Sequence, residues 1–165
     1  MGGIAEAATG RACIRDARDI DLQWVVGAIE RCLTELAQRS QAVSFDPAAT
    51  GRFLLGLLLS GQGRIWIAEV DGQPVGLRVA QLQHAPFHPR TILATGIVWY
   101  VEPPHRGHGI GGQLVEVFEH WAQEQGATWL SVLPMASARS TRAFYSHRGY
   151  TLVEEHFIKG VPDVG

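Results

Sequence analysis

Apolar residues recur along this chain with two different periods, and these periods predict a series of helices and strands. A spacing of three to four residues marks residues 18–39, where Asp19 or Asp21 can act as the helix cap. Asp46 followed by Pro47 predicts a second helix, because aspartate is a favoured N-cap and proline a favoured first helical residue. Two further helices are expected at 109–125 and 138–148.

Runs of β-branched and aromatic residues alternate with these helices and predict strands. They are expected around Cys13 and at 64–70, 74–83, 91–101 and 128–135, with a last extended segment at 150–161. Asp71, Gly72 and Gln73 join the second and third strands, and Asp-Gly is typical of a tight hairpin. We therefore expect an α/β fold with a mixed central sheet, an antiparallel N-terminal meander, a later βαβ crossover and about four flanking helices.

The composition narrows the class of protein. Of the 165 residues, 46% are hydrophobic and 18% charged, which is typical of one globular domain over residues 1–165. The formal net charge of −2 gives no reason to expect nucleic acid as a partner. The longest apolar run, at 53–59, is too short to span a membrane, and the amino terminus lacks a secretory pattern. Cys13 and Cys32 have no paired spacing, so we expect buried free thiols in a cytoplasmic protein.

The most distinctive stretch is PPHRGHGIGGQL at residues 103–114. It holds four glycines within six positions and lies at the strand-to-helix corner of the predicted crossover. A loop so poor in side chains exposes backbone N–H groups, and at a helix start these groups favour an anion, most often a phosphate. The stretch therefore predicts a phosphate-binding loop.

Three kinds of phosphate loop match parts of this stretch. A dinucleotide-binding motif fits Gly107 to Gly112, but it comes late in the chain, does not follow its strand directly, and lacks the carboxylate that should end the next strand. A P-loop is excluded because Gln113 and Leu114 occupy the positions of its lysine and hydroxyl residue. The remaining pattern is an arginine, Arg106, with glycines three and five residues later.

This pattern, the stretch AFYSHRGY at 143–150 and the order of elements together resemble the GNAT superfamily of acyl-CoA-dependent N-acetyltransferases over nearly the whole chain. The resemblance implies that backbone amides of the glycine loop hold the pyrophosphate of acetyl-CoA. The loop residues concerned are Arg106, Gly107, His108, Gly109, Ile110, Gly111 and Gly112. It also implies that Tyr100 and Val101 lend backbone groups to the pantetheine arm and thioester carbonyl, and that Tyr145 faces the sulfur.

One part of the family pattern is missing. Many relatives carry asparagine seven residues and alanine four residues before the tyrosine, where this chain has Ala138 and Thr141. Ser140 or Ser137 is expected to supply the missing hydrogen bond to the pantetheine.

The chemistry implied is direct attack of a primary amine on the thioester in a ternary complex, with Tyr145 protonating or hydrogen-bonding the leaving thiolate. Glu102 is the first candidate for a general base, and Glu69 and His84 are weaker candidates. The simpler interpretations are a core tyrosine at 145 and an exposed carboxylate at 102. No metal is expected, because the histidines lack the spacing of a metal site.

Two other classes of function remain open from the sequence. The chain could be a catalytically silent acyl-CoA sensor, which the alanine at 138 favours and the retained Tyr145 disfavours. It could also be another kind of nucleotide-binding module, although the residues such modules need are missing. The resemblance implies acetyl-CoA and an amine as partners, and a homodimer, while the sequence does not identify the amine.

Overall fold

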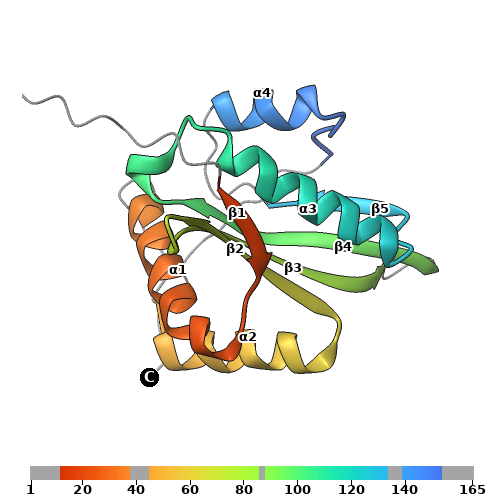
Figure 1. Ribbon diagram of the computed structural model, residues 1–165. Coiled ribbons are helices and arrows are strands. Elements are labelled where there is room, and N and C mark those ends of the chain that lie inside the picture. The colour runs from red at the N-terminus through yellow and green to blue at the C-terminus, as the bar shows by residue number, and fades with distance from the viewer. Residues whose placement is uncertain (1–11, 38–44, 86–87, 134–138, 154–165) are drawn as a thin grey trace, which may run out of the picture.

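The computed structural model describes residues 12–37, 45–85, 88–133 and 139–153. A mixed sheet of strand order β1-β2-β3-β4-β5 lies between two layers of helices (Figure 1). The strands are β1 (Cys13–Asp16), β2 (Gly63–Val70), β3 (Gln73–Ala85), β4 (His88–Val101) and β5 (Trp129–Val132). The helices are α1 (Leu22–Ala37), α2 (Pro47–Ser60), α3 (Ile110–Glu124) and α4 (Arg139–His147), with short 3-10 turns at Asp19–Asp21 and Pro103–His105.

The predicted architecture is confirmed. Strands β1 to β4 pair antiparallel, whereas β4 and β5 pair parallel and are connected through α3, which is the expected crossover. The last extended segment differs, since residues 150–153 form no strand and residues 154–161 lie outside the described part of the chain.

Local sequence signals account for several boundaries. The hairpin between β2 and β3 turns at Asp71 and Gly72, whose φ angles of 52° and 73° are those of a primed two-residue turn. Helix α2 begins as predicted, because the Asp46 carboxylate accepts a 2.9 Å hydrogen bond from the N–H of Ala49. Before α1, Asp21 accepts a 2.7 Å bond from the N–H of Arg18, so this carboxylate closes the 3-10 turn that leads into the helix.

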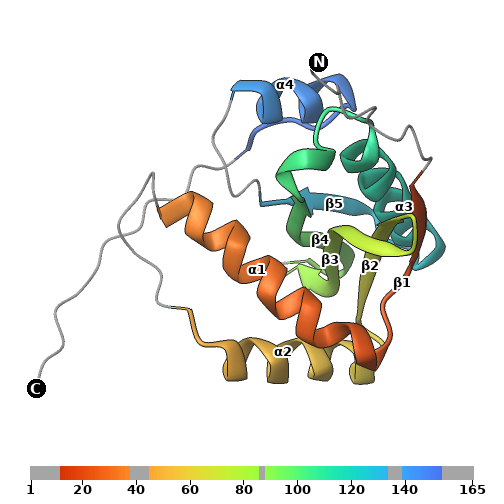
Figure 2. The same cartoon turned by 60° about the vertical axis from the view of Figure 1, so that its left-hand side comes forward.

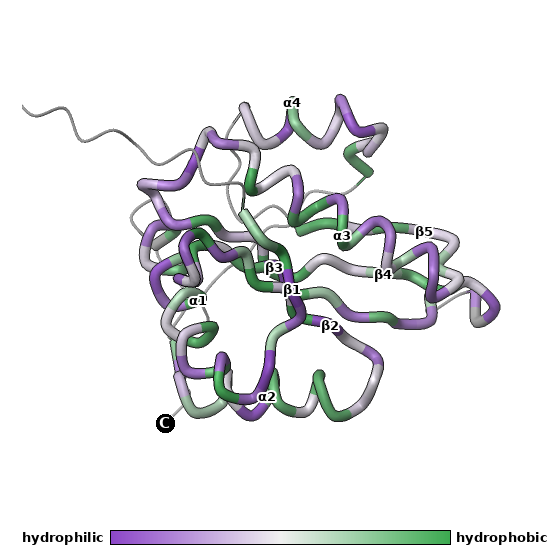
Figure 3. The backbone as a smooth tube through the Cα atoms, viewed as in Figure 1, coloured by the Kyte–Doolittle hydropathy of each residue, from purple (hydrophilic) through white to green (hydrophobic). Residues whose placement is uncertain are grey.

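Each face of the sheet has its own hydrophobic core. Helices α1 and α2 cover one face and α3 and α4 lie on the other, as the turned view shows (Figure 2). The first core packs Val25 and Leu54 against Leu77 and Val79, and the second packs Phe118 and its neighbours on α3 against the opposite side of the same strands. The hydrophobic runs of the strands therefore lie between two helical layers (Figure 3).

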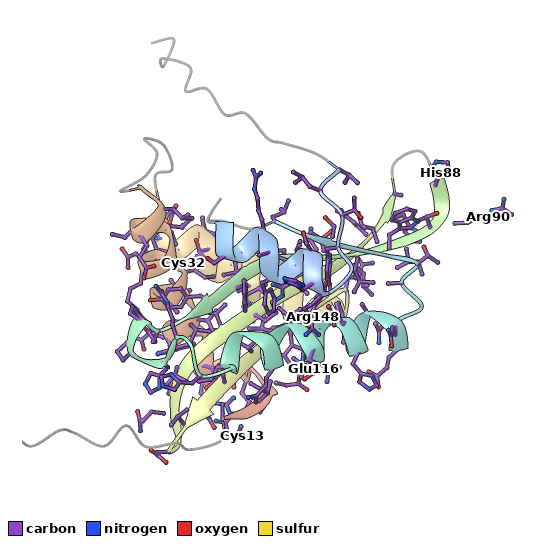
Figure 4. All side chains as sticks on the ribbon, turned by 90° about the horizontal axis from the view of Figure 1, so that it is seen from above. Cys13, Cys32, His88, Arg90, Glu116 and Arg148 are labelled. Carbon is purple, nitrogen blue, oxygen red and sulfur yellow. The ribbon has the colours of Figure 1, made fainter. Side chains whose placement is uncertain are left out.

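The two cysteines have different environments. Cys32 lies in α1 within the first core and is buried as expected, and burial is the main cause that raises the pKa of its thiol to about 11. Cys13 is exposed, so the expectation that it is buried is wrong. It begins the edge strand β1, where the side chain turns to solvent (Figure 4).

A β-bulge in β4 shapes the sheet near its parallel edge. Val79 pairs with Val98 but Ala80 pairs with Gly96, which leaves Ile97 as the extra residue. The pairing of β4 with β5 covers Leu93 to Gly96 and has no further register pair in the described residues. After the bulge, β4 therefore leaves its neighbour and offers an edge without a ladder partner among the residues described.

Candidate active site

The glycine loop lies at the N-terminus of α3, beyond the end of β4. Gly107 and Gly109 have φ angles of 82° and 83°, and Gly109 is the residue before the helix. The N–H groups of Ile110, Gly111 and Gly112 open the helix, and such groups have no carbonyl partner within it. The loop thus has the backbone geometry of an anion site, with the positive end of the helix dipole behind it.

Two adjacent glycines of the loop have different structural roles. A side chain at Gly111 would place its Cβ 2.8 Å from Cζ2 of Trp99, and the Gly111 carbonyl accepts a 3.1 Å hydrogen bond from the Trp99 indole. A Cβ at Gly112 would meet no atom within 4 Å. Gly111 is therefore needed for close packing, whereas open space above Gly112 fits the approach of a bulky ligand.

Arg106 behaves differently from the rest of the predicted loop. Its N–H donates to the carbonyl of Pro103 at 3.3 Å, and its Nε donates to the carbonyl of Val101 at 2.7 Å. Its Nη2 forms an ion pair of 2.9 Å with Glu35 on α1. The side chain of Arg106 therefore ties the loop to β4 and α1, and its N–H is already engaged within the loop.

The backbone groups of Tyr100 and Val101, two predicted site residues on β4, point in opposite directions. The N–H of Glu102 donates to Val75 on β3 at 2.8 Å, and Tyr100 is paired with Leu77 in the same register. Because backbone groups alternate along a strand, those of Tyr100 face β3 and those of Val101 face the edge that β5 leaves uncovered. Tyr100, predicted to lend backbone groups to the cosubstrate, therefore directs them to β3, whereas Trp99 and Val101 direct theirs to the uncovered edge.

The side chain of Tyr100 instead lines a pocket on the α1 face of the sheet. The pocket has a volume of about 470 Å³ and is lined by residues of α1 and the end of β4. These residues are Gly27, Glu30, Arg31, Thr34, Glu35, Tyr100, Glu102 and Pro103. Three of these residues carry carboxylates, and two of them are ion-paired, Glu102 with Arg31 and Glu35 with Arg106.

Glu102, the predicted general base, is held on both sides of its carboxylate. Its Oε1 accepts bonds of 3.1 and 2.6 Å from Nε and Nη2 of Arg31, and its Oε2 accepts a 3.1 Å bond from the hydroxyl of Tyr100. Burial, followed by this bond to Glu102, raises the pKa of Tyr100 to about 12. The hydroxyl therefore stays protonated and holds the carboxylate at the pocket wall.

Tyr145 of α4 lies on the opposite face of the sheet, within a cluster of aromatic rings. Its ring makes edge contacts with Trp99, Phe144 and Tyr150 at centroid distances of 5.2 to 5.4 Å. The side chain is 5% exposed, and its hydroxyl accepts a 3.1 Å hydrogen bond from Nη1 of Arg78. Burial raises the pKa of this phenol, and the charge of Arg78 opposes the rise.

The other predicted residues lie in different places. Glu69 accepts bonds of 2.6 and 2.9 Å from Arg15, so its carboxylate is engaged at the β1 edge. His84 is exposed on β3 opposite Ile92, far along β4 from the bulge. Ser140 is exposed in the first turn of α4, and Ser137 lies outside the described residues.

Sequence reasoning missed Arg78 and Glu35. The signal for Arg78 was present, since it is the one charged residue in the apolar part of its strand, PVGLRVA. An arginine in such a position must find a partner across the core. Glu35 carries no such signal, because its contact with Arg106 joins residues that are far apart in the sequence.

Among the described residues no three His, Cys, Asp or Glu side chains are grouped so as to hold a metal ion. No helix of the described part is long and apolar enough to cross a membrane.

Comparison with known proteins places this site in context. The family model of the acetyltransferase (GNAT) domain matches residues 61–152. An aminoglycoside N(6')-acetyltransferase type 1 of Stenotrophomonas maltophilia is 27% identical over 108 residues, which cover 55% of this chain and 71% of that protein. The family match includes the glycine loop and the helix that carries Tyr145.

Solved structures share the fold at low sequence identity. A predicted acetyltransferase of Clostridium acetobutylicum, crystallised with acetyl-CoA, superposes with a TM-score of 0.77 at 18% identity, covering 91% of this chain and 96% of that one. A GCN5-related N-acetyltransferase of Ralstonia eutropha gives a TM-score of 0.73 at 22% identity, covering 93% of this chain and all of that one. At these identities the likeness concerns the fold.

Proposed function

The chain belongs to the GNAT family of acetyltransferases, and from this premise we propose that it transfers an acetyl group from acetyl-CoA to a primary amine. The observation that carries the proposal is a juxtaposition in the structure. The open N-terminus of α3 lies beside the edge of β4 that β5 leaves uncovered, and Tyr145 is buried against Trp99 on that same strand.

The loop and the strand edge supply the groups that acetyl-CoA needs. The pyrophosphate would accept hydrogen bonds from N–H groups between Gly107 and Gly112, where the glycines allow close approach and the helix dipole favours negative charge. The pantetheine arm carries amides, and the outward backbone groups of Trp99 together with the N–H of Val101 can pair with them as a neighbouring strand would. Ser140 in the first turn of α4 remains the proposed side-chain donor to this arm.

The acceptor amine is proposed to enter the carboxylate-lined pocket of the α1 face. An amine arrives as a cation, and it must lose a proton before it attacks the thioester. At pH 7 this loss costs about 4.6 kcal/mol for an amine of pKa 10.4 and only about 1 kcal/mol for an α-amino group near 7.8. We propose Glu102 as the group that receives this proton, directly or through a water molecule.

Tyr145 is the proposed proton donor to the leaving group. Attack by the neutral amine on the thioester carbon forms a tetrahedral intermediate, and its collapse breaks the C–S bond. The phenol of Tyr145 stays protonated at neutral pH because burial raises its pKa, so it can supply the proton that the thiolate takes up. The products are an amide and the free thiol of CoA.

The direct test is acetyl transfer to a panel of amines, followed by release of the CoA thiol. The panel should hold an aminoglycoside, because the curated relative bears that name, together with a polyamine, an amino acid and a peptide with a free amino terminus. Thiol release that requires one of these amines is the expected result. Binding of acetyl-CoA without release in any case would support the sensor instead, and tight binding of NAD or ATP but not CoA would reject both functions.

The role of Glu102 has a separate test with a matched control. Glu102→Gln should lower kcat/KM at pH 7 more for a polyamine than for an α-amino acceptor, because the polyamine needs more help to lose its proton. Glu30→Gln removes a carboxylate from the same pocket and should leave this ratio unchanged. Equal losses for both acceptors in Glu102→Gln would show that the carboxylate acts only through structure or binding.

The resemblance also implies a homodimer, and the sequence itself predicts a cytoplasmic protein. Helix α2 supports an association of two copies, because Phe53, Leu55 and Leu59 are 49%, 42% and 79% exposed on it. Light scattering should give twice the mass of one chain, and the mass of a single chain would reject the dimer.

A further inference from the structure

Arg78 of β3 is a buried arginine without a carboxylate partner among the residues the structure describes. It is 1% exposed and lies on the α3 face of the sheet, where its Cζ is 4.5 Å from the ring centroid of Phe118. Its one hydrogen bond in the described structure runs from Nη1 to the hydroxyl of Tyr145, while Nε and Nη2 have no partner there. Burying a charge in this way is costly, so a role other than packing must be considered.

The guanidinium of Arg78 lies at the point where the pairing between β4 and β5 ends. Gly96 is the last residue of β4 in register with β5, and a Cβ at Gly96 would collide with Nη2 of Arg78. The bulge at Ile97 follows directly. Glycine at this position therefore leaves room for Arg78 beside the open edge of β4, where the thioester of a bound cosubstrate is proposed to lie.

The direction of the hydrogen bond from Arg78 determines where the hydroxyl proton of Tyr145 can point. A guanidinium can only donate, so the phenol oxygen must accept from Arg78, and its own O–H is left to donate to another atom. We propose that Arg78 is a positioning residue for acetyl transfer, which holds Tyr145 as the proton donor to the leaving sulfur. This inference rests on the proposed function, because it assumes that acetyl-CoA binds along β4.

When the C–S bond breaks, its electron pair goes to sulfur, which takes the proton of the Tyr145 hydroxyl and becomes the free thiol. The phenolate left behind accepts hydrogen bonds from Arg78 until the proton that the attacking nitrogen loses, carried by water, restores the phenol. The positive charge lowers the free energy of both anions, the departing thiolate and the phenolate.

The other charges around Tyr145 offset each other. Glu119 of α3 and Arg148, which follows α4 directly, form an ion pair with bonds of 2.6 and 3.1 Å, and Arg148 lies where these two helices meet (Figure 4). The phenol of Tyr150 also contacts the ring of Tyr145 but is neutral. Arg78 is thus the uncompensated charge next to the hydroxyl among the described residues.

The test uses the thiol of CoA bound to the protein and needs no acceptor. The ultraviolet absorbance of the thiolate reports its titration in the binary complex. In the wild type the thiol pKa should lie below its free value, and Arg78→Met, which keeps the volume but removes charge and donors, should raise it by at least one unit, a tenfold change in ionisation. The matched control is the double variant Glu119→Gln with Arg148→Met, which should leave the thiol pKa unchanged, because it removes an ion pair whose two charges offset each other.

Tyr145→Phe and the double variant with Arg78→Met test whether Arg78 acts through the tyrosine. Tyr145→Phe should also raise the thiol pKa, and adding Arg78→Met to it should change the value much less than in the wild type, since the two side chains act as a unit. Should Arg78→Met fail to fold, Arg78→Lys, which keeps the charge, should retain a lowered thiol pKa, and Tyr145→Phe should still raise it. A bound thiol that titrates alike in the wild type, Arg78→Met and Tyr145→Phe would overturn this inference alone, whereas failure of CoA to bind would overturn the proposed function with it.

Discussion

Substitution of Gly112 by glutamate should change acetyl-CoA affinity and stability in opposite directions. Gly112 has open space around its Cβ and stands in the first turn of α3, so a glutamate fits without a clash. A carboxylate there is favoured by the helix dipole by about 0.3–1 kcal/mol, and losing a helical glycine adds roughly 0.5–1 kcal/mol. The melting temperature of the free protein should therefore rise, by about 2–4 °C for each kcal/mol.

The same carboxylate should repel the pyrophosphate of acetyl-CoA. Two like charges about 5 Å apart repel by roughly 3 kcal/mol at an effective dielectric constant of about 20, and salt reduces this value. A loss of about 1.4 to 3 kcal/mol then corresponds to a 10- to 150-fold weaker Kd. Titration calorimetry with acetyl-CoA measures this loss, and thermal unfolding measures the gain in stability.

Two control variants separate charge from shape at this loop. Gly112→Gln has nearly the same shape without the charge, so it should weaken acetyl-CoA binding less than Gly112→Glu. Gly111→Ala should instead destabilise the free protein, because its Cβ would meet Trp99 at 2.8 Å. If Gly112→Glu binds acetyl-CoA as tightly as the wild type while remaining folded, the loop does not hold the pyrophosphate.

Three further predictions concern other groups of the structure. Tyr145→Phe should lower kcat about 10- to 1,000-fold, while the affinity for acetyl-CoA stays within a few-fold of the wild-type value. It should also lower the melting temperature, because Arg78 loses its hydrogen-bond acceptor. Turnover at the wild-type rate would reject the catalytic role of Tyr145. The hydrogen bond with Arg15 is the main cause that lowers the pKa of Asp21 from 3.8 to about 2. The ionised carboxylate therefore stabilises the fold above pH 4, and this contribution is lost as the pH drops toward 2. Acid unfolding of Asp21→Asn should show a smaller loss of folding free energy over that pH range. A thiol reagent should label Cys13 quickly and Cys32 only on unfolding, as peptide mass spectrometry can show, and equal rates would contradict the burial described.

Much of the fold could be predicted because its signals are local. Asp71 and Gly72 encode the hairpin, and Asp46 with Pro47 encodes the start of α2, each through the dihedral angles or hydrogen bonds of neighbouring residues. The glycine loop is another local signal, since its conformation depends on a few adjacent residues. Such features survive without knowledge of the tertiary structure.

Features that depend on distant partners could not be predicted in this way. The bulge at Ile97 depends on how β4 packs against β3, and it decides that Trp99 rather than Tyr100 turns its backbone groups outward. The contact between Arg78 and Tyr145 joins two elements separated by 67 residues. Cys13 shows the same limit, because a residue at a sheet edge is exposed or buried according to what covers that edge.

On the proposed function, acetyl-CoA lies along the edge that β4 exposes where it departs from β5, and it thereby contributes to the stability of the fold. The amides of Trp99 and Val101 lack a ladder partner in the described structure, and a bare strand edge is a template for pairing with other chains. Ligand at a hundredfold excess over its Kd stabilises the native state by about 2.7 kcal/mol. The lifetime of this protein in a cell should therefore depend on the concentration of acetyl-CoA. At low concentration the edge of β4 is exposed and the protein can aggregate, whereas at high concentration the bound ligand covers the edge. Amide hydrogen exchange at Trp99 and Val101 should slow when acetyl-CoA is added.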